Sequence, residues 1–411
     1  MNKTFYISTV FLGLTVAHIQ TNAQGTWTQK GDFGGTGRIN AVVFSIGNKG
    51  YLGLGNDASA TIYCKDLWEY DPIYNNWTQK ADFPSIPRDR ATSFSIGNKG
   101  YIGFGVDTSI YYNDFWEFDP LSNNWTQKSN FNKVAAYRPV GFSIGSKGYV
   151  GLGWNNLQTD TEFWEWDQLT DTWSQKANFA GSPRWGAAGF SIGNKGYIGL
   201  GLSCAGLNSD FWEWNQTTNV WTQKANFGGG NREYVASFTI GSKGYIGTGY
   251  GTAPSYMKKD LWEYDSSLNT WIQMADFPGT ERDGAAGFAI GNKGYIGTGL
   301  DLSGNYRKDF WEYDPNGVTE INDIVINRST IIFPNPFCAQ TTLQTDNLLH
   351  NATLTVYNLH GQTVKQIKNI SGQTVVLSRD NLPSGLYFVR LTQDNKVIAI
   401  DKLVVSDESN H

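Results

Sequence analysis

A glycine-rich phrase occurs six times in the sequence, at intervals of roughly 50 residues. The copies begin at Phe44, Phe94, Phe142, Phe190, Phe238 and Phe288, and each reads close to FSIGNKGYIGLG. A phosphate-binding loop needs only one such phrase, and the spacing matches neither the P-loop nor the dinucleotide fingerprint. An internal period of this length is typical of a solenoid or a propeller, in which each unit buries its apolar face against its neighbours.

Each repeat contains four short β segments, which we call a, b, c and d. Strand a is the apolar run that ends in FSI, and the turn GNKG leads into strand b, YIGLG, because its glycines accept positive φ at little cost. Strand c reads close to DFWEY, and a turn containing Asp-Pro and Asn-Asn leads into strand d, WTQK. The pattern therefore predicts one four-stranded antiparallel sheet per repeat.

Twelve of the 16 tryptophans keep this register. Strand c carries Trp68, Trp116, Trp164, Trp212, Trp262 and Trp311, and strand d carries Trp27, Trp77, Trp125, Trp173, Trp221 and Trp271. A fully buried aromatic side chain contributes about 2 to 3 kcal/mol of transfer free energy. We therefore expect these rings to pack neighbouring sheets against each other.

The two ends of the repeat region are complementary. The chain enters it with an isolated strand d at Trp27 and leaves it after a strand c at Trp311 that has no d behind it. Pairing these two strands completes a sixth four-stranded sheet and removes an exposed edge, so we predict a ring closed by the N-terminal strand. The alternative is an open array that leaves both strands unpaired.

The repeats resemble the kelch family of β-propellers in the glycine-rich strand b, the aromatic residue on strand c and the Trp on strand d. The resemblance covers residues 24–315 and implies an all-β, six-bladed propeller. The sequence departs from the family pattern at the end of strand b, where G-L-G, G-F-G or G-T-G replaces the usual pair of glycines.

The N-terminus has the features of a secretory signal peptide over residues 1–23. Lys3 precedes an apolar run from Phe5 to Ala17, and small or polar residues follow before Gln24. The run is shorter than the roughly 18 to 20 residues of a membrane span, and no other such run follows, so we predict export without a transmembrane segment.

The composition excludes some classes of function. The net charge is −5 and no long run of Lys or Arg occurs, so we expect no nucleic-acid partner. Charged residues make up 17% and aromatic residues 15% of the chain, which indicates a packed β-rich protein and not a disordered one. Cys64 and Cys204 belong to repeats on opposite sides of the ring, whereas a disulfide needs Cα atoms within about 7 Å, so we predict that they are not paired.

The two rims of the predicted ring differ in variability. The a–b and c–d turns barely change between repeats, whereas the b–c loops change in length and chemistry, as expected of loops that carry binding specificity. The b–c loops also carry aromatic side chains that suit sugars and peptides, namely Tyr63, Tyr111, Tyr112, Trp154, Tyr256 and Tyr306. A role in covering the blade ends explains these rings equally well.

The same rim carries an arginine before strand a in each repeat. The set is Arg38, Arg88, Arg138, Arg184, Arg232 and Arg282. As ligand-binding residues they would hold carboxylates or acidic sugars through bidentate hydrogen bonds. As structural residues each would pair with an acidic residue of strand c, and the sixfold identity favours this second interpretation.

Enzyme chemistry has few candidate residues in the repeats. The four histidines, His18, His350, His360 and His411, all lie outside the predicted ring, which excludes histidine-based catalysis and imidazole metal sites there. Catalysis by a pair of carboxylates remains possible. Glu281 and Asp283, beside Arg282, are local candidates for such a pair, and a solvated loop end explains them equally well. We name no catalytic residue and expect neither a metal ion nor a cofactor.

Residues 331–411 follow a linker, residues 316–330, and contain alternating strands separated by Asn, Gly and Pro turns, which predict a small immunoglobulin-like β-sandwich. The segment resembles the C-terminal sorting domain of Bacteroidetes proteins exported by the type IX secretion system. The matching pieces are FPNP from Phe333, YNLHG from Tyr357, LPSGLYFVRL from Leu382 and KLVV from Lys402. Asn358 stands where Asp is common, and a plain accessory sandwich is the alternative.

The sequence therefore favours a secreted or surface-attached binding protein. Its b–c and d–a loop face would recognise a glycan or an extracellular protein, and its C-terminal domain would engage the type IX secretion machinery. Two alternatives stay open: a carbohydrate-active enzyme, such as a carboxylate-using sugar epimerase or lyase, and a structural surface protein.

Overall fold

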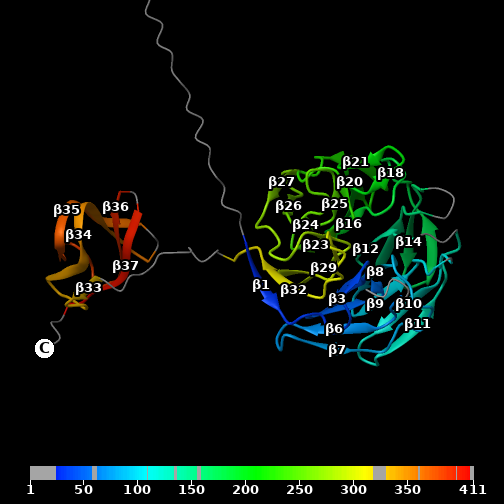
Figure 1. Ribbon diagram of the computed structural model, residues 1–411, viewed down its shortest axis with the longest axis horizontal. Helices are drawn as coiled ribbons and strands as arrows, with labels where there is room; N and C mark the ends of the chain where they lie inside the picture. The colour runs from blue at the N-terminus through cyan, green and yellow to red at the C-terminus, as the bar shows by residue number, and fades with distance from the viewer. Residues whose placement is uncertain are drawn as a thin grey trace, which may run out of the picture. The chain divides into compact units, whose positions relative to one another are not determined.

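The computed structural model describes residues 25–57, 63–108, 110–133, 137–154, 159–317, 330–359, 362–394 and 396–407. The chain divides into two compact units, Met1–Val318 and Thr319–His411, coloured blue to yellow and orange to red in Figure 1. The predicted signal peptide and most of the predicted linker lie outside the described residues. Regular structure in the described ranges consists of β-strands, so the expected all-β class is confirmed.

The first unit contains, within its described residues, six four-stranded antiparallel sheets, which we number 1 to 6 in chain order of their a strands. The a strands are β3 (Val42–Ile46), β8 (Thr92–Ile96), β12 (Val140–Ile144), β16 (Ala188–Ile192), β23 (Ala236–Ile240) and β29 (Ala286–Ile290). The b strands are β4 (Lys49–Gly53), β9 (Lys99–Gly103), β13 (Lys147–Gly151), β17 (Lys195–Gly199), β24 (Lys243–Gly247) and β30 (Lys293–Gly297).

The outer half of each sheet is formed by strands c and d. The c strands are β6 (Leu67–Asp71), β10 (Phe115–Asp119), β14 (Phe163–Asp167), β20 (Phe211–Asn215), β26 (Leu261–Asp265) and β32 (Phe310–Asp314). The d strands of sheets 1 to 5 are β7 (Asn76–Gln79), β11 (Asn124–Lys128), β15 (Thr172–Gln175), β21 (Val220–Lys224) and β27 (Thr270–Gln273). The a, b, c, d order along the chain is thus also the order of the strands across each sheet.

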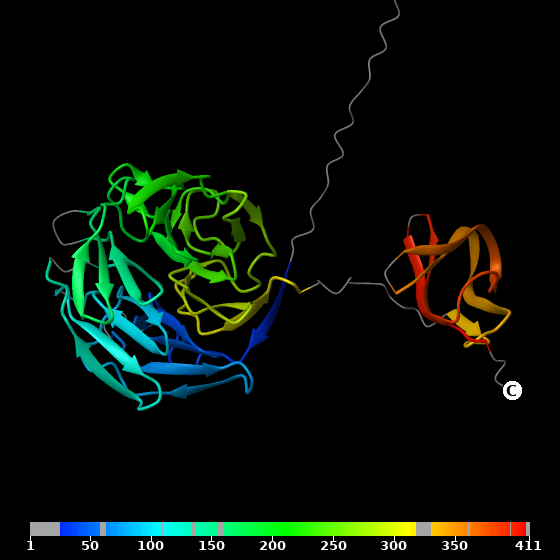
Figure 2. The same cartoon turned by 180° about the vertical axis from the view of Figure 1, so that it is seen from behind.

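The fourth strand of sheet 6 comes from the other end of the repeats. Strand β1 (Thr26–Lys30) pairs antiparallel with β32, so that Trp27 lies opposite Tyr313 and Lys30 opposite Phe310. The pairing predicted between the first and last strands of the repeat region is therefore present. The a strands of consecutive sheets contact each other, and β29 of sheet 6 contacts β3 of sheet 1. Figure 2 shows the sheets arranged around a common centre, as is typical of propeller-like folds.

Neighbouring sheets meet through a glycine of strand b and a phenylalanine of the preceding strand a. A Cβ atom added to Gly148 would lie 2.2 Å from the ring of Phe94, and one added to Gly50 would lie 2.2 Å from the ring of Phe288. The six glycines in this contact are Gly50, Gly100, Gly148, Gly196, Gly244 and Gly294. The glycine of the KGY triplet is thus required by the distance between sheets.

The strand d tryptophans join the sheets at their outer edges. Each indole Nε1 donates a hydrogen bond to a backbone carbonyl just beyond strand d of the preceding sheet, at 2.9 to 3.3 Å. Trp27 uses the carbonyl of Ala275, which follows β27, so this contact also joins sheet 6 to sheet 5. The tryptophan register in the sequence therefore reports packing between sheets.

Short strand pairs cover one rim of the ring. Three of them join a d–a connection to a b–c loop: β2 (Arg38–Ile39) with β5 (Asn56–Asp57), β22 (Arg232–Glu233) with β25 (Tyr250–Gly251), and β28 (Arg282–Asp283) with β31 (Leu300–Asp301). A fourth pair, β18 (Leu202–Ser203) with β19 (Gly206–Leu207), lies within one b–c loop. Both kinds of loop therefore lie on the same rim, as the strand order requires.

The second unit differs from the expected sandwich. Its strands are β33 (Thr330–Phe333), β34 (Gln340–Tyr357), β35 (Thr363–Ser378), β36 (Gly385–Gln393) and β37 (Lys396–Val405). All five belong to one sheet, because the long strand β34 pairs with β33, β35 and β36. Register shifts between Gln344 and Tyr357 allow β34 to bend, and a bridge between Phe337 and Val405 brings the sheet ends together around one apolar core.

Gly148→Ala tests the sheet spacing. The added methyl group would overlap the ring of Phe94, so we expect the free energy of unfolding to fall by about 1 to 3 kcal/mol. Phe94→Leu removes the ring edge that causes the overlap, so the double variant should be more stable than the sum of the single effects predicts. Denaturant titration of the four proteins measures this coupling, and simple additivity would contradict the assigned contact.

Gly50→Ala with Phe288→Leu is the matched cycle at the contact between sheets 1 and 6. If the contact between sheets 1 and 6 is equivalent to the other sheet contacts, the coupling free energy between Gly50 and Phe288 should match that between Gly148 and Phe94.

Candidate functional site

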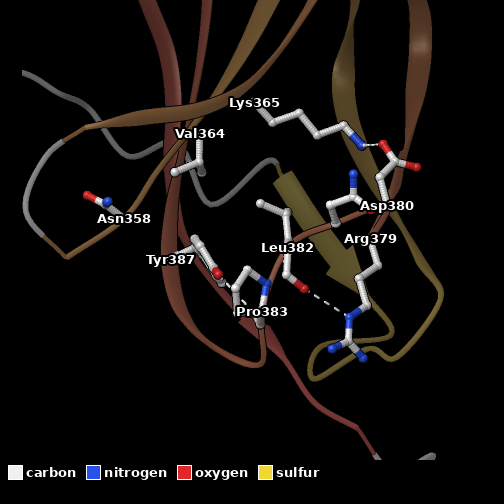
Figure 3. Close-up of a pocket in the computed structure, with 9 residues that line it drawn as sticks. Asn358, Val364, Lys365, Arg379, Asp380, Leu382, Pro383 and Tyr387 are labelled. Atoms are coloured by element: carbon white, nitrogen blue, oxygen red, sulfur yellow. Dashed lines mark hydrogen bonds and ion pairs between the residues drawn. The ribbon is translucent and has the colours of Figure 1, made fainter.

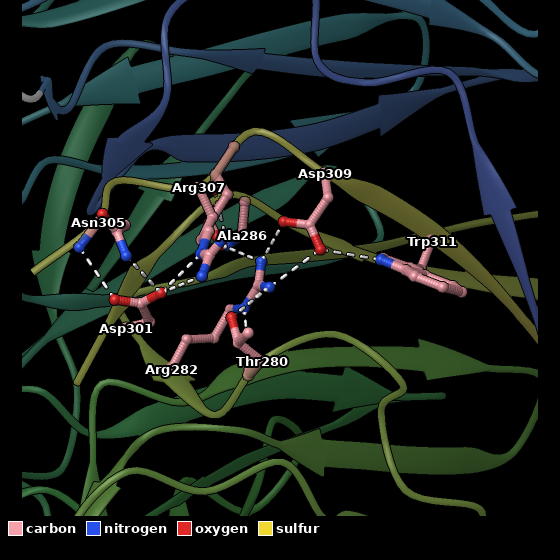
Figure 4. A network of polar contacts seen from close by, with 9 residues as sticks. Thr280, Arg282, Ala286, Asp301, Asn305, Arg307, Asp309 and Trp311 are labelled. Carbon is pink, nitrogen blue, oxygen red and sulfur yellow. Dashed lines mark hydrogen bonds and ion pairs between the residues drawn. The ribbon is translucent and has the colours of Figure 1, made fainter. Parts of the chain in front are cut away.

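Five of the six predicted rim arginines are buried ion-paired groups. Arg38, Arg88, Arg184, Arg232 and Arg282 are at most 1% exposed. Arg282 donates from Nη1 to the Thr298 carbonyl at 2.9 Å and to Asp309 Oδ1 at 2.6 Å, and from Nη2 to Asp309 Oδ2 at 2.9 Å. Figure 4 shows Arg282 and Asp309 facing each other. We call this arrangement the clasp. The acidic partners in the other four clasps are Asp66, Asp114, Asp210 and Asp260.

Each clasp links the segment that precedes strand a to the end of strand b and to the start of strand c. Burial of the Asp309 carboxyl by itself raises its pKa, but the hydrogen bonds and charge of Arg282 lower the pKa below its usual range. The Thr298 carbonyl that Arg282 binds belongs to a residue with φ of 59°. The clasp arginines therefore act as structural groups, the interpretation that their sixfold repetition favoured.

Arg138 is an exception, and the sequence-based grouping of six equivalent arginines is wrong for it. It lies four residues before Phe142, whereas the clasp arginines lie six residues before the corresponding phenylalanine. In the sequence of sheet 3, Ala136 stands at the clasp position and Glu162 stands at the position of the clasp aspartate. Arg138 instead aligns with Asn40, Arg90, Gly186, Tyr234 and Gly284, and all six have φ between 55° and 64°.

These six residues, which we call the mouth ring, surround one end of the central channel. Backbone hydrogen bonds link neighbours within it, including Arg138 N to the Arg90 carbonyl at 2.8 Å and Asn40 N to the Gly284 carbonyl at 3.0 Å. They line a space of about 150 Å³, the mouth pocket, which shares lining residues with a second space of about 240 Å³ between the a strands. The uniform backbone thus presents one variable side chain per sheet at a single opening.

Two guanidinium groups of the mouth ring lie beside aromatic rings. The guanidinium carbon of Arg138 lies 3.4 Å from the centre of the Tyr234 ring, and that of Arg90 lies 5.5 Å from the centre of the Tyr137 ring. Arg90 also forms a long ion pair with Asp89, at 3.5 Å. Among the described residues, the buried Nε atoms of Arg90 and Arg138 have no hydrogen-bond acceptor.

Two buried carboxyl groups lie next to the mouth ring in sequence. Glu233 is 5% and Asp283 is 8% exposed, and Glu233 Oε2 and Asp283 Oδ1 have no hydrogen-bond donor in the described part of the chain. Burial raises the pKa of Glu233 to about 7, although Tyr234 and the charge of Arg138 lower it. Burial likewise raises the pKa of Asp283 to about 6 against the charge of Arg138. Both carboxyls therefore take up a proton at a higher pH than an exposed carboxyl does, Glu233 at a higher pH than Asp283.

The predicted loop aromatics occupy several environments. Tyr112 donates to Asp107 at 2.7 Å and has the Arg88 guanidinium 3.8 Å from its ring centre, while Trp154 packs against Trp185 at 5.3 Å. Tyr256 stacks on Tyr250 at 5.8 Å and is 49% exposed. Tyr63 and Tyr306 are half-buried and bridge to other residues of their own loops. The rings thus support the loops and leave part of their surface open.

Sequence reasoning missed Arg90, Glu233 and Tyr234 as site residues. The signal that could have found them is position counting from the strand a phenylalanine. At the mouth ring the repeats read Asn, Arg, Arg, Gly, Tyr and Gly, so the side chains differ between repeats although the backbone conformation is shared. Asp283, noted as a local candidate for a carboxylate pair, directly precedes Gly284 of the mouth ring and is 8% exposed, so it is not a solvated loop end.

The second unit has a pocket of its own, of about 510 Å³, shown in Figure 3. Lys365 binds Asp380, Arg379 Nε donates to the Leu382 carbonyl at 3.0 Å, and the Tyr387 hydroxyl donates to the Pro383 carbonyl at 2.8 Å. Its polar groups therefore serve the local fold. No group among them is left unpaired in the way that Arg138 and Glu233 are.

The fold and the mouth define an all-β, propeller-like protein with an asymmetric opening on its loop rim. Residues 331–406 match the model of the secretion system C-terminal sorting domain. The chain is therefore exported by the type IX secretion system to the cell surface or released. Within the described residues, no helix has the length and apolar character to cross a membrane.

Among solved structures, the chain is similar to that of YjhT, with a TM-score of 0.59 and 19% identity. The match covers 68% of this chain and 95% of YjhT. At this identity the likeness concerns the fold alone. A search of curated protein sequences finds no significant match.

The free cysteines agree with the sequence-based prediction. Cys64 is buried, Cys204 is exposed, and neither forms a disulfide.

Arg184→Met tests the clasp. It leaves the Asp210 carboxylate without its main partner, so we expect the free energy of unfolding to fall by about 3 to 5 kcal/mol. Lys65→Met is the matched control, because Lys65 pairs with Asp82 and the two side chains are 51% and 42% exposed, and should cost about 1 kcal/mol or less. Because the pKa of Asp210 is lowered in the folded state, the deficit of the Arg184 variant should shrink as the pH falls through that pKa. Equal losses in denaturant titrations of both variants would contradict the structural role.

Proposed function

We propose that this protein is an extracellular glycan-binding protein built on a six-bladed kelch-type propeller, residues 24–315, closed by its N-terminal strand. The pairing of β1 with β32 and the contact between Gly50 and Phe288 support closure. The signal peptide, residues 1–23, and the sorting domain, residues 331–411, would carry the propeller out of the cell. The b–c and d–a loop face is the binding surface.

One observation carries this proposal: the loop rim surrounds an opening lined by Arg90, Arg138 and Tyr234, in which the Nε atoms of both arginines have no acceptor among the described residues. Guanidinium Nε atoms offer donors, and the carboxyls behind them offer acceptors. Saccharides present hydroxyl groups that both donate and accept, and their C–H faces pack on aromatic rings. A flat protein partner would leave the mouth pocket unfilled, so the geometry favours a glycan over an extracellular protein.

The loop aromatics give the proposal its residues. Trp154 and Tyr256 lie on b–c loops with part of their rings accessible, and Tyr63, Tyr112 and Tyr306 lie on the b–c loops of other sheets on the same rim. The opposite rim consists of short a–b and c–d turns that hardly vary between repeats. Specificity would therefore reside in the b–c loops and general affinity in the mouth.

Trp154→Ala and Tyr256→Ala test this surface. Loss of one stacking ring should weaken binding to the best ligand of a glycan array about 5- to 20-fold, since an aromatic contact contributes about 1 to 2 kcal/mol. Tyr74→Ala is the control, because Tyr74 is 76% exposed and lies in a c–d turn. Titration calorimetry measures the three affinities. An effect of Tyr74→Ala as large as that of the loop variants would place binding on the other rim.

Deletion of residues 331–411 tests the export route. A chain that lacks this segment should remain in the periplasm of a host with a type IX system, whereas the full chain reaches the surface or medium. Fusing residues 316–411 to an inert periplasmic reporter should transfer the export. Cell fractionation and immunoblotting measure both proteins, and surface delivery of the truncated chain would contradict the assignment.

A further inference from the structure

The mouth pocket contains two cationic groups, the side chains of Arg90 and Arg138, which lack the bidentate aspartate that each clasp arginine has. Each clasp arginine has a bidentate aspartate, as in Arg184 with Asp210. Arg90 has only the long pair with Asp89, and Arg138 faces the Tyr234 ring. Both side chains are only partly buried, Arg90 being 35% exposed, but their Nε atoms are buried without an acceptor among the described residues, so an acceptor supplied by a ligand is favoured.

The two arginines are held close together. They lie on neighbouring sheets at equivalent positions, and Arg138 N donates to the Arg90 carbonyl at 2.8 Å. Their like charges oppose each other, which contributes to lowering the pKa of Arg138 behind the larger effect of burial. An anion between them would relieve this repulsion and satisfy the unpartnered nitrogens.

The size of the mouth pocket limits the ligand group. A space of about 150 Å³ is smaller than the roughly 300 to 1,000 Å³ of pockets that enclose whole small molecules. It has room for one charged substituent, with the rest of the ligand outside on the loop aromatics. The six mouth-ring residues share a left-handed backbone conformation around the pocket.

We infer that the mouth pocket binds an oxyanion group, a carboxylate or a sulfate ester, of the glycan ligand between Arg90 and Arg138. The inference deepens the proposed glycan-binding function and rests on it. It makes the ligand an acidic glycan. Arg90 and Arg138 are the binding residues, and Tyr234 positions Arg138 through the contact with its ring.

The neighbouring carboxyls give the site a pH dependence of known sign. Tyr234 and the charges of Arg138 and Asp283 act on the pKa of Glu233, and the charge of Arg138 acts on the pKa of Asp283. Asp89 faces Arg90, Arg138 and Asn40. As the pH falls from 8 to 5.5, Glu233 and Asp283 take up protons and the mouth becomes more positive. A ligand that stays ionised over this range should therefore bind more tightly at pH 5.5.

The test is titration calorimetry on the full mature chain with three matched probes: D-glucuronate, D-glucose 6-sulfate and D-glucose. We expect at least one acidic probe to bind 10-fold more tightly than glucose, and the stronger of the two identifies the preferred oxyanion. Arg138→Gln and Arg90→Gln should each weaken that probe about 10-fold or more at an unchanged melting temperature. Arg307→Gln, on the same rim but paired with Asp301, should change it less than 2-fold.

The outcomes separate this inference from the proposed function. Equal binding of glucose and both acidic probes, or full affinity in both mouth variants, would overturn the oxyanion site. Neutral glycans that bind on an array and depend on Trp154 would then leave the glycan-binding proposal standing. Binding of the acidic probe that strengthens at least 3-fold from pH 8 to 5.5, and less so in Glu233→Gln, supports the site and its charge environment.

Discussion

The contact between a strand b glycine and the preceding phenylalanine ring sets the distance between sheets, and the rest of the first unit depends on it. The rings of Phe94 and Phe288 approach the backbones of Gly148 and Gly50 so closely that a methyl group does not fit. Because the same contact recurs between all neighbours, each sheet meets the next in one geometry. The tryptophan bonds at the perimeter and the clasps on the loop rim then fix the tilt and the strand ends.

Because these contacts stabilise the sheets, the positions of the mouth ring are available for function. The clasps pair each of the five buried arginines with an aspartate, and the mouth ring has one backbone conformation although its side chains differ. Asparagine, arginine, glycine and tyrosine all occupy it. A repeated scaffold with an unrepeated opening places asymmetric chemistry at the axis without disturbing the sheets.

The sequence contains most of the fold. Trp27 and Trp311 predict the strand that completes sheet 6, because an unpaired edge at each end has only one partner that removes both. It contains less of the site, because Arg138 resembles the clasp arginines in type but stands two positions later, and only counting from Phe142 separates them. The C-terminal sandwich was a wrong expectation, since alternation identifies strands such as Gln340–Tyr357 but not how many partners one bent strand takes.

Buried polar groups without hydrogen-bond partners are rare outside functional sites, because each one lowers stability. In the first unit, the buried side-chain atoms without partners are mainly those of Arg90, Arg138, Glu233 and Asp283, within the residues that the structure describes. The same short stretches are where the repeats diverge around the channel. The divergence of the repeats is an observation on the sequence, and the lack of hydrogen-bond partners is an independent observation on the structure. Their agreement at the mouth ring is the physical reason for assigning function to this opening and not to the better-satisfied arginines around it.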